Sequence, residues 1–186
     1  MPISPYEQDL IQKCYDGDRT AYRELYTRFA GELMAVAMRY MKTKQEAEDV
    51  LQDAFIKAYK NLASFNQQSA LKTWLTRIVI NTALNALRKE HQKYQWNIME
   101  AEEVHDTTSL PLESFHYTEL IAFIQQLPDG CRTVFNLYAL EGYSHKEIAD
   151  MINISMGTSK SQYFRAKQLL QEIILSEDAK TKRKAI

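Results

Sequence analysis

Glycine and proline, the residues that most often mark turns, are scarce in this sequence. Only five glycines and four prolines occur among 186 residues. A sheet built from tight hairpins needs such residues at its turns, so their scarcity favours a helical protein. No apolar run approaches the ~20 residues that a membrane span requires, and the N-terminal residues lack the basic and apolar regions of a signal peptide. We therefore expect a cytoplasmic protein.

Residues with the spacing of catalytic or metal sites are also missing. The two cysteines, Cys14 and Cys131, lie far apart in the sequence, which argues against a disulfide scaffold and favours free thiols in a reducing compartment. The four histidines lack metal-ligand spacing, and no glycine-rich phosphate loop or GxSxG elbow occurs. The sequence therefore predicts no metal, no cofactor, no small-molecule substrate and no catalytic residue.

The charges nearly cancel over the whole chain but are segregated along it. The formal net charge of −1 argues against nucleic-acid binding, because proteins that bind nucleic acids usually carry a basic surplus. Residues 54–95, however, hold seven bases and one acid, whereas residues 96–119 hold six acids and no base. The acidic stretch also lacks clear helical periodicity. It predicts a flexible acidic linker at 96–117 between two helical domains.

The first predicted domain, residues 1–95, contains apolar residues at helical spacing. They predict a short helix at 5–15 and longer helices at about 18–40 and 43–62, the last with a capping box formed by Thr43 and Glu46. A polar loop then precedes another long helix. Its expected apolar side consists of Leu71, Trp74, Leu75, Ile78, Thr82 and Ala86.

The second predicted domain, residues 118–176, has the pattern of a helix-turn-helix. Two helices, at about 118–127 and 128–140, are followed by a short helix at about 144–152. A tight turn leads to a last helix from about Met156 to Leu175, and a basic tail is expected at 177–186. The same topology also occurs without DNA binding, so a role in packing alone stays open.

Three surfaces are candidate binding sites. The first is the side of the 43–62 helix that faces away from its core stripe, where an apolar Ile56 among polar residues suggests a partner helix. The alternative is a solvated face with one exposed isoleucine, which is common. The residues of this surface are Asp49, Gln52, Asp53, Ile56 and Lys60.

The second surface combines aromatic, amide and basic residues near the polar loop. Cations hold phosphates, amides read base edges and aromatic rings stack on unpaired bases. The alternative is that the aromatic residues pack in the core and the bases are solvated. The candidates are Phe65, Asn66, Gln67, Gln68, Ser69, Lys72, Trp74, Arg77, Asn81 and Arg88, with Leu84 or Asn85 on the same helical face.

The third surface is the start of the last helix. Helical spacing there assigns Ser159, Tyr163, Ala166 and Leu170 to the core. Hydroxyl groups near a helix N-terminus favour phosphate, and outward cations can reach base edges in the major groove. The outward candidates are Thr158, Lys160, Ser161, Phe164, Arg165 and Lys167.

Taken together, these residues resemble the extracytoplasmic-function (ECF) sigma factors, the small two-domain specificity subunits of bacterial RNA polymerase. Residues 47–59 look like the core-binding helix of region 2 in that family. The −10 reader is matched by Ser64-Phe65, Thr73-Trp74-Leu75, Arg77-Ile78 and Asn81-Thr82-Ala83. Region 4 is matched by Leu127-Pro128, Gly142-Tyr143-Ser144, Glu147-Ile148-Ala149 and residues 157–161.

The resemblance implies an all-α fold, promoter-specific initiation of transcription and no catalysis by the protein itself. By this resemblance, the first surface binds the clamp of core polymerase, and the loop 65–70 captures a base flipped from the −10 strand. The last helix, with Ser144, reads the −35 duplex. The acidic linker lies toward the RNA exit path. The implied partners are core polymerase at its clamp and flap, promoter DNA and an anti-sigma factor.

Two residues depart from the family pattern. Ser159 stands where an aliphatic residue is usual, which predicts looser packing of the last helix, and Gln162 replaces a common arginine. Two other readings stay open. A sigma mimic that binds only an anti-sigma factor would not need the loop and the basic helix after it. A helix-turn-helix repressor would not explain the surface around Ile56.

Overall fold

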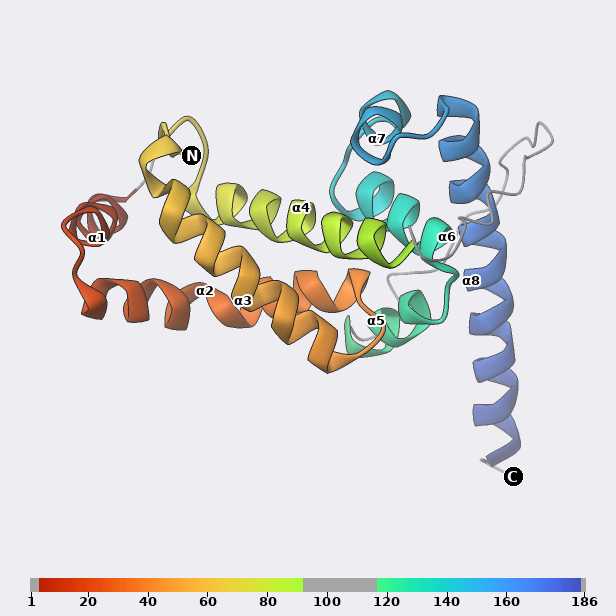
Figure 1. Ribbon diagram of the computed structural model, residues 1–186. Helices are drawn as coiled ribbons and strands as arrows, with labels where there is room; N and C mark the ends of the chain where they lie inside the picture. The colour runs from red at the N-terminus through yellow and green to blue at the C-terminus, as the bar shows by residue number, and fades with distance from the viewer. Residues whose placement is uncertain (1–3, 92–116, 185–186) are drawn as a thin grey trace. The chain divides into compact units, whose positions relative to one another are not determined.

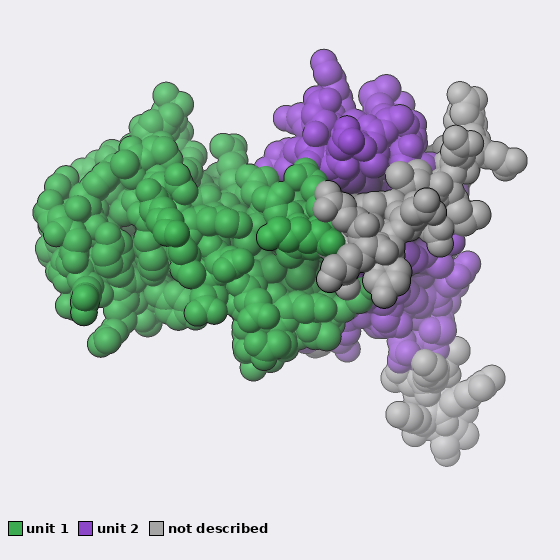
Figure 2. Space-filling model, viewed as in Figure 1, with its two compact units in different colours: residues 1–93 green, residues 94–186 purple. Residues whose placement is uncertain are grey.

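The computed structural model describes residues 4–91 and 117–184, and every regular element in these two ranges is helical (Figure 1). The predicted all-α fold is therefore confirmed. The chain divides into two compact units, residues 1–93 and 94–186 (Figure 2). The predicted linker at 96–117 lies outside the described residues, apart from Tyr117. No helix in the described part is both long and apolar enough to cross a membrane.

Within its described residues, 4–91, unit 1 contains four α-helices and one 3-10 turn. Each of the first three helices begins at a capped position, because a side-chain oxygen of Ser4, Asp18 or Thr43 accepts a bond from a backbone amide of the first turn. The predicted capping box of Thr43 and Glu46 is confirmed. The elements are α1 (Pro5–Tyr15), α2 (Arg19–Tyr40), α3 (Lys44–Asn61), η1 (Leu62–Ser64) and α4 (Leu71–His91).

Helix α4 is buried over a wider face than the sequence predicts. The expected stripe includes Trp74, Ile78 and Ala86, but these three side chains are only half-buried. The reason is that α4 packs against both α2 and α3, so two adjacent sides of the helix face the core. The fully buried residues that the predicted stripe omits are Val79, Ile80, Ala83, Leu84 and Leu87.

Unit 2 contains the predicted helix-turn-helix. A left-handed Asn153, with φ +56°, ends α7, and the chain then turns into α8. Gly142, with φ +78°, supplies the positive φ that glycine adopts without strain before α7. Pro128 precedes the second helix as its N-cap. The elements are α5 (Tyr117–Gln125), α6 (Asp129–Phe135), the π-helical turn η3 (Asn136–Leu140), α7 (His145–Ile152) and α8 (Met156–Lys184).

The predicted end of the last helix is wrong. Helix α8 continues to Lys184, nine residues beyond the expected end at Leu175, and includes most of the expected basic tail. No glycine or proline follows Gly157, so nothing in the sequence stops the helix.

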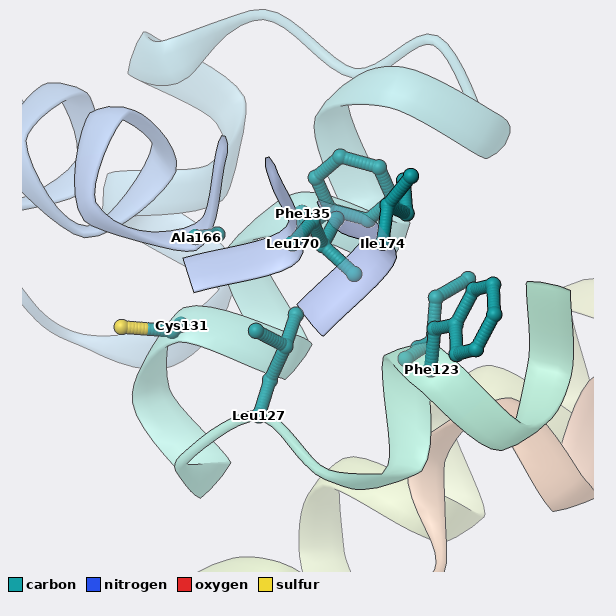
Figure 3. Close-up of a cluster of buried hydrophobic side chains, with 8 residues drawn as sticks. Phe123, Leu127, Cys131, Phe135, Ala166, Leu170 and Ile174 are labelled. Atoms are coloured by element: carbon teal, nitrogen blue, oxygen red, sulfur yellow. The ribbon is translucent and has the colours of Figure 1, made fainter. Parts of the chain in front are cut away.

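The core of unit 2 is formed by α5, α6 and α8. Figure 3 shows side chains of this core, among them Leu127 and Cys131 and, from α8, Ala166, Leu170 and Ile174. The remaining members of this cluster are Phe123, Ile124 and Phe135.

A buried arginine fastens the connection between α5 and α6. Arg132 has no exposed surface, and its guanidinium pairs with Asp129 at 2.7 Å. The same guanidinium donates to the backbone oxygens of Gln125 and Leu127. Pairing and hydrogen bonding offset the cost of burying this charge.

Candidate functional site

The outward face of α3 presents all five residues of the first predicted surface to solvent. Asp49, Gln52, Asp53, Ile56 and Lys60 are exposed, and the side chain of Ile56 keeps 43% of its surface accessible. Ile56 is therefore not part of the core of unit 1, and it is surrounded by acidic and amide side chains on this face. Single exposed apolar residues are common on protein surfaces, so the exposure of Ile56 fits both a partner surface and a solvated face.

A hollow of about 250 Å³ lies between α3 and α4, and we call it the amide hollow. Trp74 and Asn81, two of the predicted DNA-binding residues, contribute to its wall. The sequence reasoning missed most of the others, although Trp74, Ile78, Asn81 and Asn85 recur at helical steps that could have indicated a shared face. The hollow is lined by Lys57, Asn61, Ser64, Trp74, Ile78, Asn81, Thr82 and Asn85.

Hydrogen bonds hold two cations beside the amide hollow. The ammonium of Lys57 donates to the buried hydroxyl of Thr82 at 3.1 Å, which connects α3 to α4. Arg88 donates to the side-chain oxygen of Asn85 at 2.9 Å. The hollow thus combines neutral amides, which can pair with a base edge, with positive charge that attracts phosphate.

The aromatic residue of the predicted loop is part of the core. Phe65 is 5% exposed, and its ring packs against Trp74 with 5.2 Å between the centroids. The loop residues that follow are open to solvent at Asn66, Gln67 and Gln68, and Gln67 has a left-handed φ of +60°. Phe65 therefore anchors the loop to the core, while the amide side chains of Asn66, Gln67 and Gln68 face solvent.

The remaining residues of the second surface differ in how exposed they are and in whether they already pair with another side chain. Lys72 forms an ion pair with Glu32 of α2, so its charge is already compensated. Arg77 is exposed on α4, and Ser69 is half-buried. The sequence left open whether Leu84 or Asn85 belongs to this surface. Leu84 is buried, whereas Asn85 lines the amide hollow.

The start of α8 exposes only part of the third predicted surface. Lys160 and Arg165 are exposed, and Phe164 is half-buried. The prediction that Lys167 points outward is wrong. This residue is only 9% exposed, and its ammonium lies 5.9 Å from the ring centroid of Tyr163. Lys167 follows Tyr163 by four residues, which places both on the same side of the helix.

The hydroxyl groups of this surface already make hydrogen bonds within unit 2. Ser144 caps α7 and donates to Glu147 at 2.7 Å. Thr158 shares a hydrogen bond with the hydroxyl of Ser155, and Ser161 donates to the backbone oxygen of Thr158. These bonds order the first turns of α7 and α8.

The two residues that depart from the family pattern both make side-chain hydrogen bonds within unit 2. The hydroxyl of Ser159 has no exposed surface and lies 2.9 Å from Nδ1 of His145, so the position is occupied by a hydrogen bond instead of an aliphatic contact. The amide oxygen of Gln162 accepts a hydrogen bond from the thiol of Cys131. The expectation of loose packing at Ser159 is wrong.

Both cysteines are buried free thiols, as the sequence predicts. Burial raises the pKa of Cys14 to about 11 and also raises the pKa of Cys131. Both therefore stay protonated near neutral pH, which makes them unreactive. No cluster of potential metal ligands occurs among residues 4–91 and 117–184.

Comparison with known proteins identifies both units. The Sigma-70 region 2 family matches residues 25–93, and the Sigma-70, region 4 family matches residues 117–170. The RNA polymerase sigma-H factor of Pseudomonas aeruginosa is 32% identical over 185 residues, which cover 90% of this chain and 93% of that factor.

Two further similarities agree with this result. The ECF RNA polymerase sigma-E factor of Escherichia coli K12 is 32% identical over 176 residues, with 88% of this chain and 92% of the relative covered. The sigma factor RpoE of Bartonella quintana, solved in complex with the anti-sigma factor NepR, is 26% identical with a TM-score of 0.50. That match covers 82% of this chain and 96% of the solved one. This chain belongs to the sigma-70 family and is an RNA polymerase sigma factor of the extracytoplasmic-function type.

Proposed function

We propose that this sigma factor directs promoter-specific initiation through three separate surfaces. The outward face of α3 binds the clamp of core polymerase. The amide hollow and the loop at 65–69 hold the single-stranded −10 element, and the first turns of α8 read the −35 element as duplex. In this proposal residues 1–95 act as region 2 and residues 118–176 as region 4. The protein acts in the cytoplasm beside polymerase and catalyses nothing itself.

The amide hollow is the observation that carries this proposal. An unpaired base needs hydrogen-bonding groups for its edge and an aromatic or apolar surface for its face. The hollow offers the first through Asn81, beside Asn61 and Asn85, whose amides also bond to the backbone oxygen of Lys57 and to Arg88, and the second through Trp74 and Ile78. A base that enters it leaves the duplex stack, so its capture lowers the cost of melting.

Positive charge around the hollow supports a nucleic-acid ligand. Lys57 lines the hollow, Arg88 is bonded to Asn85 at its wall, and Arg77 is exposed on the same helix. Phosphate contacts of this kind position a strand without reading its sequence. The amides would then select the base, and the cations would hold the backbone beside it.

The helix-turn-helix supports recognition of duplex DNA. Lys160 and Arg165 are exposed on α8, and the amide groups of its first turn carry the positive end of the helix dipole. A recognition helix places its N-terminal residues against base edges in the major groove. Ser144, Thr158 and Ser161 lie at or near the helix starts, where phosphate contacts are favoured.

The exposed Ile56 supports a protein partner on α3. A helix of the polymerase clamp could cover the isoleucine while its basic residues meet Asp49 and Asp53. The related RpoE of Bartonella quintana was solved with the anti-sigma factor NepR. We extend this to an anti-sigma partner for the present chain, which would compete with polymerase or DNA for one of the three surfaces.

Transcription in vitro with host core polymerase tests the proposal. Genomic fragments are transcribed with and without the protein, and the transcript starts are mapped. Asn81→Ala should reduce permanganate reactivity of thymines in the −10 bubble, while Arg165→Ala should weaken −35 binding by about 1–3 kcal/mol if it reads a base.

The matched control is Gln12→Ala, which removes an exposed amide from α1 and should leave both readouts unchanged. Loss that is equal on all duplex sequences would make Arg165 a phosphate contact. If the protein supports no new transcript starts, or if both variants open promoters like the wild type, the assignment of these surfaces is wrong. Binding to an anti-sigma factor without transcription would favour the sigma-mimic reading.

A further inference from the structure

A part-buried hydrogen bond connects the two helices of the helix-turn-helix. Nδ1 of His145, the first residue of α7, lies 2.9 Å from the hydroxyl oxygen of Ser159 in the first turns of α8. Ser159 has no exposed surface, so water cannot replace this partner. A hydroxyl buried in this way depends on its single side-chain partner to avoid a desolvation cost.

Aromatic rings from two other elements contact the imidazole of the half-buried His145. The ring of Tyr138, in η3, stacks on His145 with 4.2 Å between centroids and an interplanar angle of 13°. The ring of Tyr163, in α8, lies 4.6 Å from Tyr138 and 5.9 Å from His145, edge-on to the latter. Tyr163 also stacks on Phe135 of α6. The imidazole is therefore held by η3, α7 and α8 together.

The directionality of a hydrogen bond distinguishes this contact from ordinary apolar packing. Donor, hydrogen and acceptor must remain nearly in line, whereas aliphatic side chains can slide past one another with little loss. Ser159 is flanked by Thr158 and Lys160, two residues of the proposed −35 surface. A rotation of α8 that moved these residues would also break the bond to His145.

We propose that His145 and Ser159 are positioning residues that set the rotation of α8 on the −35 duplex. The inference rests on the proposed role of α8 in −35 recognition. Neither residue needs to contact DNA. The bond orients the first turns of α8, and the stack of Tyr138 on His145 fixes the imidazole that accepts or donates it.

A matched pair of substitutions separates the effect of the hydroxyl group from the effect of side-chain volume. Ser159→Thr and Ser159→Val add nearly the same bulk to a fully buried position, but only threonine keeps the hydroxyl. The assay uses holoenzyme assembled from host core polymerase and the full chain. Its probes are a linear promoter fragment with a mapped start and the same fragment with a scrambled −35 element.

We expect Ser159→Val to reduce the preference for the intact over the scrambled fragment by about three- to tenfold, as loss of one part-buried hydrogen bond predicts. Ser159→Thr should retain the preference within about twofold. If threonine and valine behave alike, whether both keep or both lose the preference while folded, the hydroxyl does not position the helix and the proposal is overturned.

A second variant covers the case in which the added methyl groups unfold unit 2. His145→Phe keeps a ring to stack on Tyr138 and removes the ring nitrogens, with a six-membered ring in place of the imidazole. It should lower the −35 preference by a similar factor. Ser159→Ala combined with His145→Phe should lose little more than either change alone, because both remove the same bond. Additive losses would contradict a shared role.

Two controls show whether a negative result contradicts the positioning role or the proposed −35 surface. Ser176→Ala removes another hydroxyl from α8, one that is exposed and bonded only within its own turn, and should keep the full preference. Arg165→Ala tests the underlying function in the same assay. If Arg165→Ala loses the preference and valine does not, only the positioning role falls. If Arg165→Ala keeps the preference and also binds both fragments as tightly as the wild type, the proposed −35 surface itself is wrong.

Discussion

Phe65 packs its ring against Trp74 at 5.2 Å between centroids and so fastens the loop after α3 to the first turns of α4. Trp74 in turn lines the amide hollow. The wall of the hollow is thus supported from the core side by an aromatic contact, and the loop amides stay in solvent.

Phe65→Ala should destabilise unit 1 by about 3–5 kcal/mol, because it leaves a cavity beneath Trp74 in a buried position. Promoter opening should fall with it. Urea unfolding followed by Trp74 fluorescence, in a Trp96→Phe background, measures the loss. Tyr6→Ala, which truncates an exposed ring on α1, should cost no more than about 1 kcal/mol. An unchanged urea midpoint for Phe65→Ala would contradict its placement in the core.

Asp129→Ala should destabilise unit 2 by about 3–5 kcal/mol, because it leaves the buried guanidinium of Arg132 without its carboxylate. The matched control is Glu32→Ala, which breaks the solvent-exposed ion pair with Lys72 and should cost less than about 1 kcal/mol. Amide hydrogen exchange of α6 and of α2 measures the two effects separately. Similar losses in both variants would show that burial of Arg132 does not matter.

The stability of unit 2 should fall as the pH drops below about 6.5. Burial, with a smaller effect of the Lys160 charge, lowers the pKa of His145 below its ordinary value of 6.5. The folded state therefore favours neutral imidazole. Its stabilising effect is complete above pH 6.5 and is lost as the pH falls through the lowered pKa.

Hydrogen exchange of α7 at pH 7.5 and pH 5.5, corrected for the intrinsic exchange rate, tests this dependence. The His145→Phe variant has no titrating group there and should lose much less protection between the two pH values. An identical loss in wild type and variant would assign the pH dependence to other groups.

Asp53→Ala and Ile56→Ala should each weaken binding to core polymerase by about fivefold or more, as expected when central interface residues are truncated. Both side chains are exposed, so the fold should remain intact. Fluorescence anisotropy of labelled protein titrated with host core polymerase gives the affinities. Glu48→Gln, an exposed change on the same helix, should bind like the wild type. If all three bind equally well, this face of α3 does not contact the clamp.

Local sequence signals were sufficient wherever the interaction was itself local. The capping box of Thr43 and Glu46 is predicted from spacing, and the structure confirms Thr43 as the N-cap of α3. The predicted end of α8 at Leu175 is wrong because no glycine or proline after Gly157 stops the helix there. A helix ends at a specific residue only where the sequence contains a stop signal.

The sites were only partly visible in the sequence, because they are made by residues from different helices. Asn61 lines the amide hollow from the end of α3, and Asn81 lines it from α4, and no single-helix pattern joins them. In the same way, helical spacing assigns Lys167 to the outward side of the last helix, but its position one turn after Tyr163 places its ammonium over that ring.

By itself, the sequence determined the all-α fold, the helix-turn-helix and the sigma-factor family, because helical spacing, caps and contiguous motifs are properties of neighbouring residues. The tertiary structure alone decided that Ser159 bonds to His145 and that Lys57 bonds to Thr82. Each of these bonds joins residues of different helices that packing brings within about 3 Å, the distance at which hydrogen bonds form. The physical reason is that side-chain partners across helices are selected by packing, which a one-dimensional pattern does not contain.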